Sequence, residues 1–385
     1  FIYAIASTIS ALTADRAMHS FGESALWIKL TLFPLALMLF REIPRSRVLL
    51  LRTFLFFGVF IAAMGLAQYA LLDHRDLEHR ITGPTAHVMT FSGLLLALSL
   101  LYFVLTLYYR RPWLIAGTAV ITLTLLLTFT RSVWIGWIAA VTILILLIRV
   151  RWIAYAAPLF VLFITFMPLS LFSRLVSTFN LKQSSNLDRV RMVQAGVEII
   201  KDYPLLGVGP ANIVEVYPFY RSHDAPRFKI PHLHDNPVQI WAERGIVALI
   251  AYFMLIILFL RECGRAWRGP RREFAQAGVA IAVGLTYAGL FEFNFGDTEV
   301  LLCLINLFAL VIAFIEPPLP NPAYPSVNDS ADLFGPAGSH PIPANELPAG
   351  VVRSGEKGEP AVSGASPSAW PGPVFPASPH TDTAP

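Results

Sequence analysis

The sequence has few charged residues and almost no cysteine. Charged residues make up 14% of its 385 positions, whereas a soluble domain carries roughly 25%. An ordinary soluble protein is therefore excluded. The two cysteines stand apart, Cys263 in a basic loop and Cys303 inside an apolar run, so a disulfide framework is excluded as well.

Long basic stretches are also missing. The net charge of +4 comes from arginines in short clusters between apolar runs, and this is how the topology of a membrane protein is encoded. No nucleic-acid partner is therefore expected.

Apolar runs dominate what is present. Hydrophobic residues make up 55% of the chain, and several runs approach the ~20 residues with which a helix crosses a bilayer. We expect an all-α, polytopic transmembrane helical bundle of about ten spans. The runs are 1–14, 25–40, 48–71, 87–108, 113–129, 132–148, 153–172, 237–260, 275–293 and 299–315. The chain is already apolar at Phe1, which leaves room for one or two further helices ahead of it.

Arginine clusters predict the orientation of these spans. They follow every second span, and by the positive-inside rule the loops that hold them are cytoplasmic. The clusters are Arg41, Arg45 and Arg47; Arg110 and Arg111; Arg149 and Arg151; and Arg261, Arg265, Arg268, Arg271 and Arg272. The long loop at about 173–236 then lies on the outer, periplasmic side.

The composition changes after Ile315. Pro, Ala, Gly and Ser prevail from 317 to 385, and such a segment buries too little apolar surface to offset its ordering entropy. We therefore divide the chain into a transmembrane domain, 1–316, and a Pro-rich disordered cytoplasmic tail, 317–385.

Arg131 lies between two apolar runs in the segment TFTRSVWIGW. An arginine at this depth is costly unless it has a partner. It either snorkels to anchor a helix end or binds an anion on the outer side.

An amphipathic helix on the membrane surface is predicted in the outer loop. Asn186 can cap it and Pro204 can end it. Its apolar positions are Leu187, Val190, Val193, Val197 and Ile200. Arg189 and Arg191 in its first turn are unfavourable beside the helix dipole unless an anion or Asp188 compensates them. A solvated face with a local Asp–Arg pair is the alternative.

The outer loop ends in PHLHDNPVQIWAERG. This segment sets His234 beside three polar neighbours, His232, Asp235 and Asn236. His234 could accept a proton or orient a hydroxyl near neutral pH. The i, i+2 spacing of two histidines is weak support for a metal, so no metal site is expected. The preceding GVGPAN lacks the third glycine of a phosphate loop and is predicted to be a structural turn.

Two acidic pairs lie in other predicted outer loops, Asp76 with Glu78 and Asp297 with Glu299. Such pairs could hold a divalent cation. Short acidic turns are more often solvated, and that is the interpretation adopted.

Arg131, Arg189 and His234 are far apart in the sequence but all fall on the predicted outer side. Two guanidinium groups can hold an anionic leaving group without a metal, and a histidine supplies a base. Convergence of the three predicts a site for an anionic leaving group.

The segments around these residues resemble the O-antigen ligase and polymerase family of bacterial envelope proteins. The resemblance runs from about 78 to 313. LTFTRSVWIGW is similar to the family's hairpin motif, DRVRMVQAGVEIIKDYPLLGVGPANI to its outer-loop helix and turn, and HLHDNPVQIWAERGI to its His–Asn re-entry motif. HRITGPTAHVMTFSG and GLFEFNFGDTEV are also similar. The sequence departs at Asp235, where the family often has asparagine, which leaves the role of the displaced Asn236 open.

The resemblance implies an inverting, metal-independent transfer of a glycan from undecaprenyl diphosphate to an acceptor hydroxyl of lipid A-core. The site would face the periplasm from the bacterial inner membrane, and no cofactor is implied. Arg131 and Arg189, with Arg191, would bind the diphosphate, and His234 would act on the acceptor. His232, Asp235 and Asn236 are candidates for orienting that acceptor.

Two alternatives remain. An O-antigen polymerase or a protein O-oligosaccharyltransferase would use the same donor with another acceptor. A transporter or flippase would need polar groups along the inside of the bundle. The apolar runs are nearly bare of charge apart from Lys29 and Arg52 near helix ends, which favours a transferase.

Overall fold

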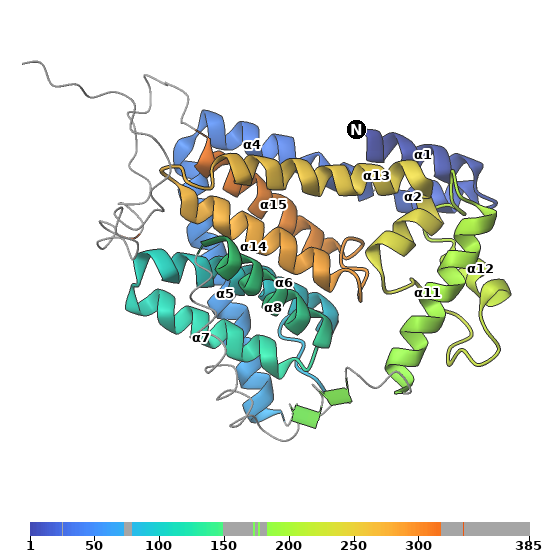
Figure 1. Cartoon of the computed structure of the whole chain (residues 1–385), viewed down its shortest axis with the longest axis horizontal. Coiled ribbons are helices and arrows are strands. Elements are labelled where there is room, and N and C mark those ends of the chain that lie inside the picture. The colour runs from blue at the N-terminus through green and yellow to red at the C-terminus, as the bar shows by residue number, and fades with distance from the viewer. Residues whose placement is uncertain are drawn as a thin grey trace, which may run out of the picture. The chain divides into compact units, whose positions relative to one another are not determined.

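The structure is a computed structural model that describes residues 1–24, 26–72, 79–148, 172–173, 176–177, 183–316 and 334. All regular secondary structure within these residues is helical, so the predicted all-α class is confirmed (Figure 1). The helices are α1 (Ile2–Thr13), α2 (Ala17–Ser24), α3 (Leu26–Leu30), α4 (Leu32–Glu42), α5 (Pro44–Leu71), α6 (Val88–Tyr109), α7 (Pro112–Leu127), α8 (Arg131–Ile148), α11 (Ser184–Asp202), α12 (Ile213–Tyr220), α13 (Asn236–Arg265), α14 (Arg272–Ala288) and α15 (Thr298–Ile315).

Five of the described helices are long and apolar enough to cross a membrane: α5, α6, α8, α13 and α15. Helices α1 and α7 are apolar but shorter. The span expected at 25–40 is interrupted at Thr31, between α3 and α4, and nearly all of 153–172 lies outside the described residues. The chain is thus a multi-pass membrane protein, and the full count of about ten spans stays a prediction.

Helix ends that the arginine clusters assign to one side of the membrane contact each other. On the side expected to be cytoplasmic, Tyr109 at the end of α6 donates a 3.0 Å hydrogen bond to Glu273 at the start of α14. On the opposite side, the backbone N–H of Asn236 at the start of α13 donates to Gly289 O, after α14, at 2.7 Å. The alternation of loops is therefore consistent with the packing of the helices.

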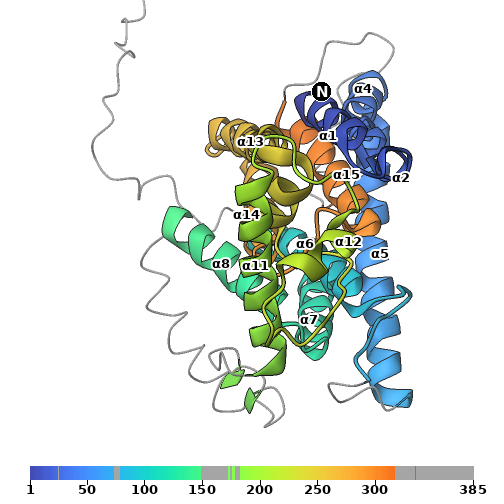
Figure 2. The same ribbon diagram turned by 90° about the vertical axis from the view of Figure 1, so that its right-hand side faces the viewer.

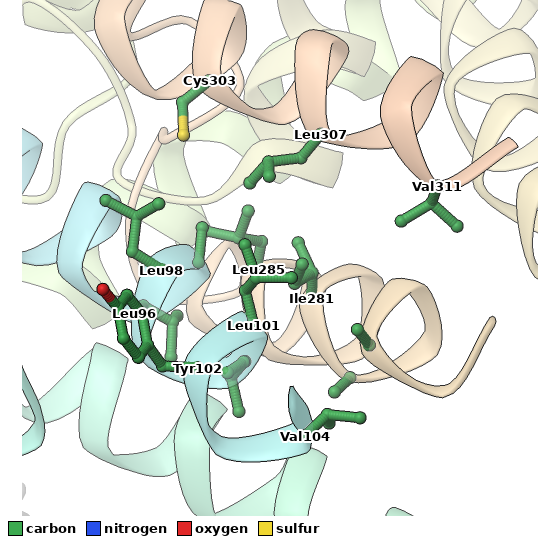
Figure 3. Close-up of a cluster of buried hydrophobic side chains, with 14 of the residues drawn as sticks. Leu96, Leu98, Leu101, Tyr102, Val104, Ile281, Leu285, Cys303, Leu307 and Val311 are labelled. Atoms are coloured by element: carbon green, nitrogen blue, oxygen red, sulfur yellow. The ribbon is translucent and has the colours of Figure 1, made fainter. Parts of the chain in front are cut away.

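Helix α6 supplies much of the core between the spans. Leu101 of α6 packs with Ile281 of α14 and Leu307 of α15 in one continuous buried cluster (Figure 3). Small residues allow α8 and α14 to approach closely, because a Cβ added to Gly136 would lie 2.4 Å from the carbonyl oxygen of Gly284. Close backbone approach at small residues is how helices associate within lipid, where burial of apolar surface drives nothing.

The predicted loop helix exists as α11, but its predicted cap is wrong. The helix begins at Ser184, with Gln183 at the N-cap position. Asn186 lies inside the first turn, and its side-chain amide donates to Ser177 O at 3.0 Å. A residue already in helical conformation cannot cap the helix, because a cap requires an extended backbone.

The buried face of α11 differs from the predicted apolar stripe. Met192 and Ile199 are buried and pack in one cluster with Leu233, just before α13, and α11 contacts α13 while running in a different direction (Figure 2). Val190 and Val197 of the predicted stripe are exposed, whereas Ile200 of that stripe is buried in the same cluster. The protein core takes one side of α11, and the valine side remains for lipid or solvent.

The chain divides into two units, Phe1–Pro341 and Ile342–Pro385, and all described residues fall in the first. Of the expected tail, 317–385, Phe334 alone is described. Its ring stacks on that of Tyr109, with 4.1 Å between ring centroids. The disorder expected for the rest of the tail concerns residues outside the described ones.

Candidate functional site

His234 has an uncommon backbone conformation where the outer loop enters α13. Its φ of 55° lies in the left-handed region, which residues with a Cβ seldom occupy. On one side, the backbone N–H of Leu233 donates to Gln239 Oε1 at 2.7 Å. On the other, Asp235 Oδ1 accepts from the N–H of Val238 at 2.7 Å and caps α13. The first turn of α13 thus holds His234 from both sides.

Glu292 joins two of the predicted site residues. Its Oε1 lies 2.8 Å from His234 Nδ1 and its Oε2 lies 3.5 Å from Arg189 Nη2. The Glu292 side chain is 11% exposed. Burial raises the pKa of Glu292, but the hydrogen bond and charge of His234 and the charge of Arg189 outweigh it and hold this pKa below its usual value. The group is therefore a carboxylate at neutral pH.

The state of Glu292 decides how His234 is used. A carboxylate can only accept hydrogen bonds, so the Nδ1 of His234 carries the proton that is shared with it. In the neutral imidazole, Nε2 is then the lone-pair nitrogen. The pair has the geometry of a base whose tautomer is set by an acid behind it.

His232 packs against His234. Their ring centroids are 4.2 Å apart, and the ring of Phe293 lies 5.8 Å from that of His232. Burial, followed by the charge of His234, lowers the pKa of His232 to about 4, so this imidazole is neutral near pH 7. Its Nδ1 is buried and has no hydrogen-bond partner among the described residues.

The same residues could hold a metal ion. Ligand atoms of His232, His234 and Glu292 all lie within 4.8 Å of one another, and two histidines with one carboxylate suit Zn²⁺. The guanidinium of Arg189 competes for the carboxylate from 3.5 Å. The sequence prediction of no metal therefore remains open to test.

Asn236 connects the start of α13 to the turn that holds Glu292. Its Nδ2 donates to Asn294 Oδ1 at 2.7 Å, and its Oδ1 accepts from the N–H of Phe295 at 3.2 Å. Asp235 caps α13, and burial raises the pKa of Asp235 to about 6. Both side chains thus hold the frame around His234, and their expected role in orienting an acceptor stays a prediction.

Arg131 is directed toward the start of α11. Its side chain is buried, rather than extended into water as a snorkelling anchor would be. The acceptors of its guanidinium include Ser177 O, Gln183 Oε1, Ser185 Oγ and Asn186 Oδ1, at 2.6–3.0 Å. Since Asn186 lies one helical turn before Arg189, Arg131 is linked to Arg189 through α11. The expected single cavity around Arg131, Arg189 and His234 stays a prediction.

Arg191 points to another part of the loop. It forms an ion pair with Asp224, after α12, and donates to Gln194 at 2.7 Å. Asp188 pairs with Arg227, with 2.5 Å between Asp188 Oδ2 and Arg227 Nη2. Asp188 therefore pairs across the loop, rather than locally with an arginine of the first turn of α11 as the alternative interpretation expected.

Sequence reasoning missed Glu292 and one charged pair. Glu292 lies within GLFEFNFGDTEV, a segment in which the sequence singles out Asp297 and Glu299 as an acidic pair. Asp297 caps α15 through the N–H groups of Glu299 and Val300, at 3.1 Å each. Buried Glu243 and Arg244 form an ion pair inside α13. The apolar run at 237–260 is therefore less bare of charge than expected. The other acidic pair, in 76–78, lies outside the described residues.

Comparisons with known proteins find a similarity in the central part of the chain. A comparison with curated proteins finds no match. The family model described as O-antigen ligase matches residues 116–253, a segment that contains Arg131, Arg189 and His234. Over residues 116–253, the chain is similar to the O-antigen ligase family.

Proposed function

We propose that the protein transfers a glycan from undecaprenyl diphosphate to an acceptor hydroxyl of lipid A-core, as an O-antigen ligase. The observation that carries this proposal is the bridge in which Glu292 lies 2.8 Å from His234 and 3.5 Å from Arg189. It joins a base to a phosphate-binding group on segments that the sequence separates widely. The family match supports the class of enzyme.

In the proposed reaction, the acceptor oxygen attacks the anomeric carbon of the donor sugar from the face opposite the diphosphate. The new C–O bond forms as the bond to the diphosphate oxygen breaks, so the configuration inverts. The acceptor proton passes to Nε2 of His234, because Glu292 occupies Nδ1. Glu292 then stabilises the imidazolium that results.

Arginines receive the leaving group in this proposal. Arg189 keeps guanidinium donors near Glu292, and the side chain of Arg131, from α8, reaches the start of the helix that carries Arg189. Diphosphate oxygens would exchange with the neutral acceptors that Arg131 binds in this structure. Gln183 makes no side-chain cap bond at the start of α11, so first-turn N–H groups of α11 can add donors to the same anion. Arg191 remains a weaker candidate because Asp224 already neutralises it.

The acceptor would approach from the side of the histidines. The ring of His232 lies directly against His234, and its buried Nδ1 would become a polar contact for a sugar hydroxyl once the side chains that cover it move. The expected roles of Asp235 and Asn236 would be indirect, through the start of α13. By the positive-inside rule, this whole face would be periplasmic in the inner membrane.

A flippase is the alternative from another class, and one observation bears on it. A substrate pathway needs polar groups through the depth of the bundle, and the Glu243–Arg244 pair is such a group within α13. The pair lies eight residues or fewer after Asn236 in a helix that runs to Arg265, so it belongs to the same end as His234. This position favours a site at one face.

The test is reconstitution of the full chain in proteoliposomes with undecaprenyl diphosphate-linked glycan and core lipopolysaccharide lacking polymer. We expect ligated product on a gel in the presence of a chelator, and its loss in His234→Ala and Arg189→Ala. Polymerised glycan on the lipid carrier, with none on the core, would identify a polymerase. Transport without any transfer would identify a flippase and overturn the proposal.

A further inference from the structure

Helix α13 is broken near its outer end. Gly245 has φ 76° and ψ 177°, which are not helical values. The break leaves a short helical piece, 236–244, that begins two residues after His234, and a long piece, 246–265. The backbone N–H and C=O groups freed at such a break need partners, because unpaired backbone groups are costly within a membrane.

The turn after α11 supplies those partners. The N–H of Val208 donates to Ala242 O at 2.9 Å, and the N–H of Gly209 donates to Glu243 O at 2.9 Å. In return, the N–H of Ile246 donates to Pro204 O at 3.2 Å. The segment 204–212, which we call the docking turn, is therefore bonded to both edges of the break.

Two glycines make this close approach possible. A Cβ added to Gly245 would lie 1.9 Å from Leu205 O, and a Cβ added to Gly207 would lie 2.4 Å from the carbonyl carbon of Glu243. Both residues also have positive φ, at 76° and 70°. The docking turn and the break thus fit each other at backbone level.

The side chain of Glu243 reinforces the contact. It is 3% exposed, and its Oε1 accepts from the backbone N–H of Ala211 at 2.9 Å. Its second oxygen pairs with the guanidinium of Arg244, whose Nε donates to Ser7 Oγ of α1 at 3.1 Å. Ser10 of α1 donates to the carbonyl oxygen of Glu243 at 2.7 Å. One residue thus ties together the docking turn, the break and α1.

We propose that Glu243 is a positioning residue that sets the distance between Arg189 and His234. This inference rests on the proposed function for its meaning. Arg189 lies on α11, the docking turn follows α11 directly, and that turn is bonded to the short piece of α13 that holds His234. The chain from Arg189 to His234 is therefore closed into a frame at Glu243, nine residues after His234.

The experiment compares three variants of the full chain in detergent or nanodiscs. Glu243→Ala removes the acceptor for Ala211 and the partner of Arg244. Glu243→Gln keeps an oxygen for Ala211 and removes the charge, and it is the variant to rely on if the alanine variant fails to fold. Glu198→Gln, in an exposed ion pair with Lys201 on α11, is the matched control.

Two measurements need no catalysis. Amide hydrogen exchange reports on the N–H groups of Val208, Gly209 and Ala211, which the docking turn bonds to α13. The rate of modification by diethyl pyrocarbonate reports on His234. We expect both rates to rise at least about tenfold in Glu243→Ala, which corresponds to a change of about 1.4 kcal/mol in local opening, less in Glu243→Gln, and to stay unchanged in Glu198→Gln.

Kinetic measurements distinguish a positioning role of Glu243 from a purely structural one. Misplacing a base lowers kcat more than it raises the KM for the donor, so we expect kcat to fall at least about tenfold in Glu243→Gln with a donor KM within about twofold. Unchanged exchange of the docking turn would overturn the inference, and so would faster exchange with unchanged His234 reactivity. If the wild-type protein transferred no glycan, the two chemical measurements would still decide whether Glu243 positions His234.

Discussion

Glu292 lies 2.8 Å from the Nδ1 of His234, although 58 residues separate the two along the chain. The contact spans two helices, because His234 precedes α13 and Glu292 follows α14. It fixes which ring nitrogen of His234 carries the proton, and it links this histidine to Arg189.

The negative charge of the Glu292 side chain is expected to matter more for activity than the size of that side chain. Glu292→Gln keeps the size of the side chain but removes the charge that stabilises an imidazolium, so kcat should fall about 10²-fold or more. Transfer to core lipopolysaccharide measures the loss. Glu215→Gln, which removes an exposed partner of Arg16, should retain activity. Full activity of Glu292→Gln would remove Glu292 from the mechanism.

The guanidinium of Arg189 is expected to be irreplaceable by lysine. A point charge does not reproduce a planar fork on phosphate oxygens, so Arg189→Lys and Arg189→Ala should both lose about 10²-fold or more in kcat/KM. Arg131→Ala should also lose activity while expression is retained. Arg191→Lys is the comparison, because Arg191 lies on the same helix and already pairs with Asp224. Equal losses of kcat/KM at Arg191 and Arg189 would mean that activity depends on the overall positive charge of α11 rather than on Arg189 itself.

Acid is expected to destabilise the fold partly through His232. The pKa of His232 is lowered to about 4 in the folded protein from a usual value of 6.5. The unfolded chain therefore binds more protons between these values, so the stability present above pH 6.5 is lost as the pH falls toward 4. Thermal unfolding at pH 7.5 and 5.0 should show a smaller drop in midpoint for His232→Gln than for wild type. Exposed His223→Gln should keep the wild-type drop, and equal drops in all three would refute the linkage.

The orientation in the membrane is testable with two matched cysteines. Glu198→Cys on α11 and Glu262→Cys on α13 both replace exposed members of i, i+3 ion pairs. The native Cys263 and Cys303 are buried and should react slowly. In intact cells, an impermeant maleimide should label position 198, and it should label position 262 after permeabilisation alone. The reverse pattern would place the site on the cytoplasmic side.

Much of the fold can be predicted because its signals are local. Runs of apolar residues mark α5, α6, α8, α13 and α15, since each helix meets lipid or core along most of its length. The predictions are wrong where the conformation of a short segment depends on residues that are distant in the sequence. Asn186 has the side chain of a cap, but Ser177 and Arg131 draw it into other hydrogen bonds.

The residues of the candidate site likewise divide into those that the sequence predicts and one that it does not. Arg131, Arg189 and His234 stand out from the sequence because charged or titratable groups beside apolar runs need a reason. Glu292 does not stand out, since an acidic residue in a short loop is ordinary until its partners are known. Its partners lie 58 and 103 residues away, and no local pattern encodes a pairing over such distances.

Hydrophobicity and helical periodicity alone therefore settle that this chain forms helices in a membrane, and where most of them lie. Tertiary structure decides which face of α11 is buried, where α13 breaks, and which carboxylate sets the tautomer of His234. The physical reason is the range of the forces involved. Burial of apolar surface acts on every residue of a run, whereas a hydrogen bond such as that of Glu292 exists only after distant helices have packed within about 3 Å.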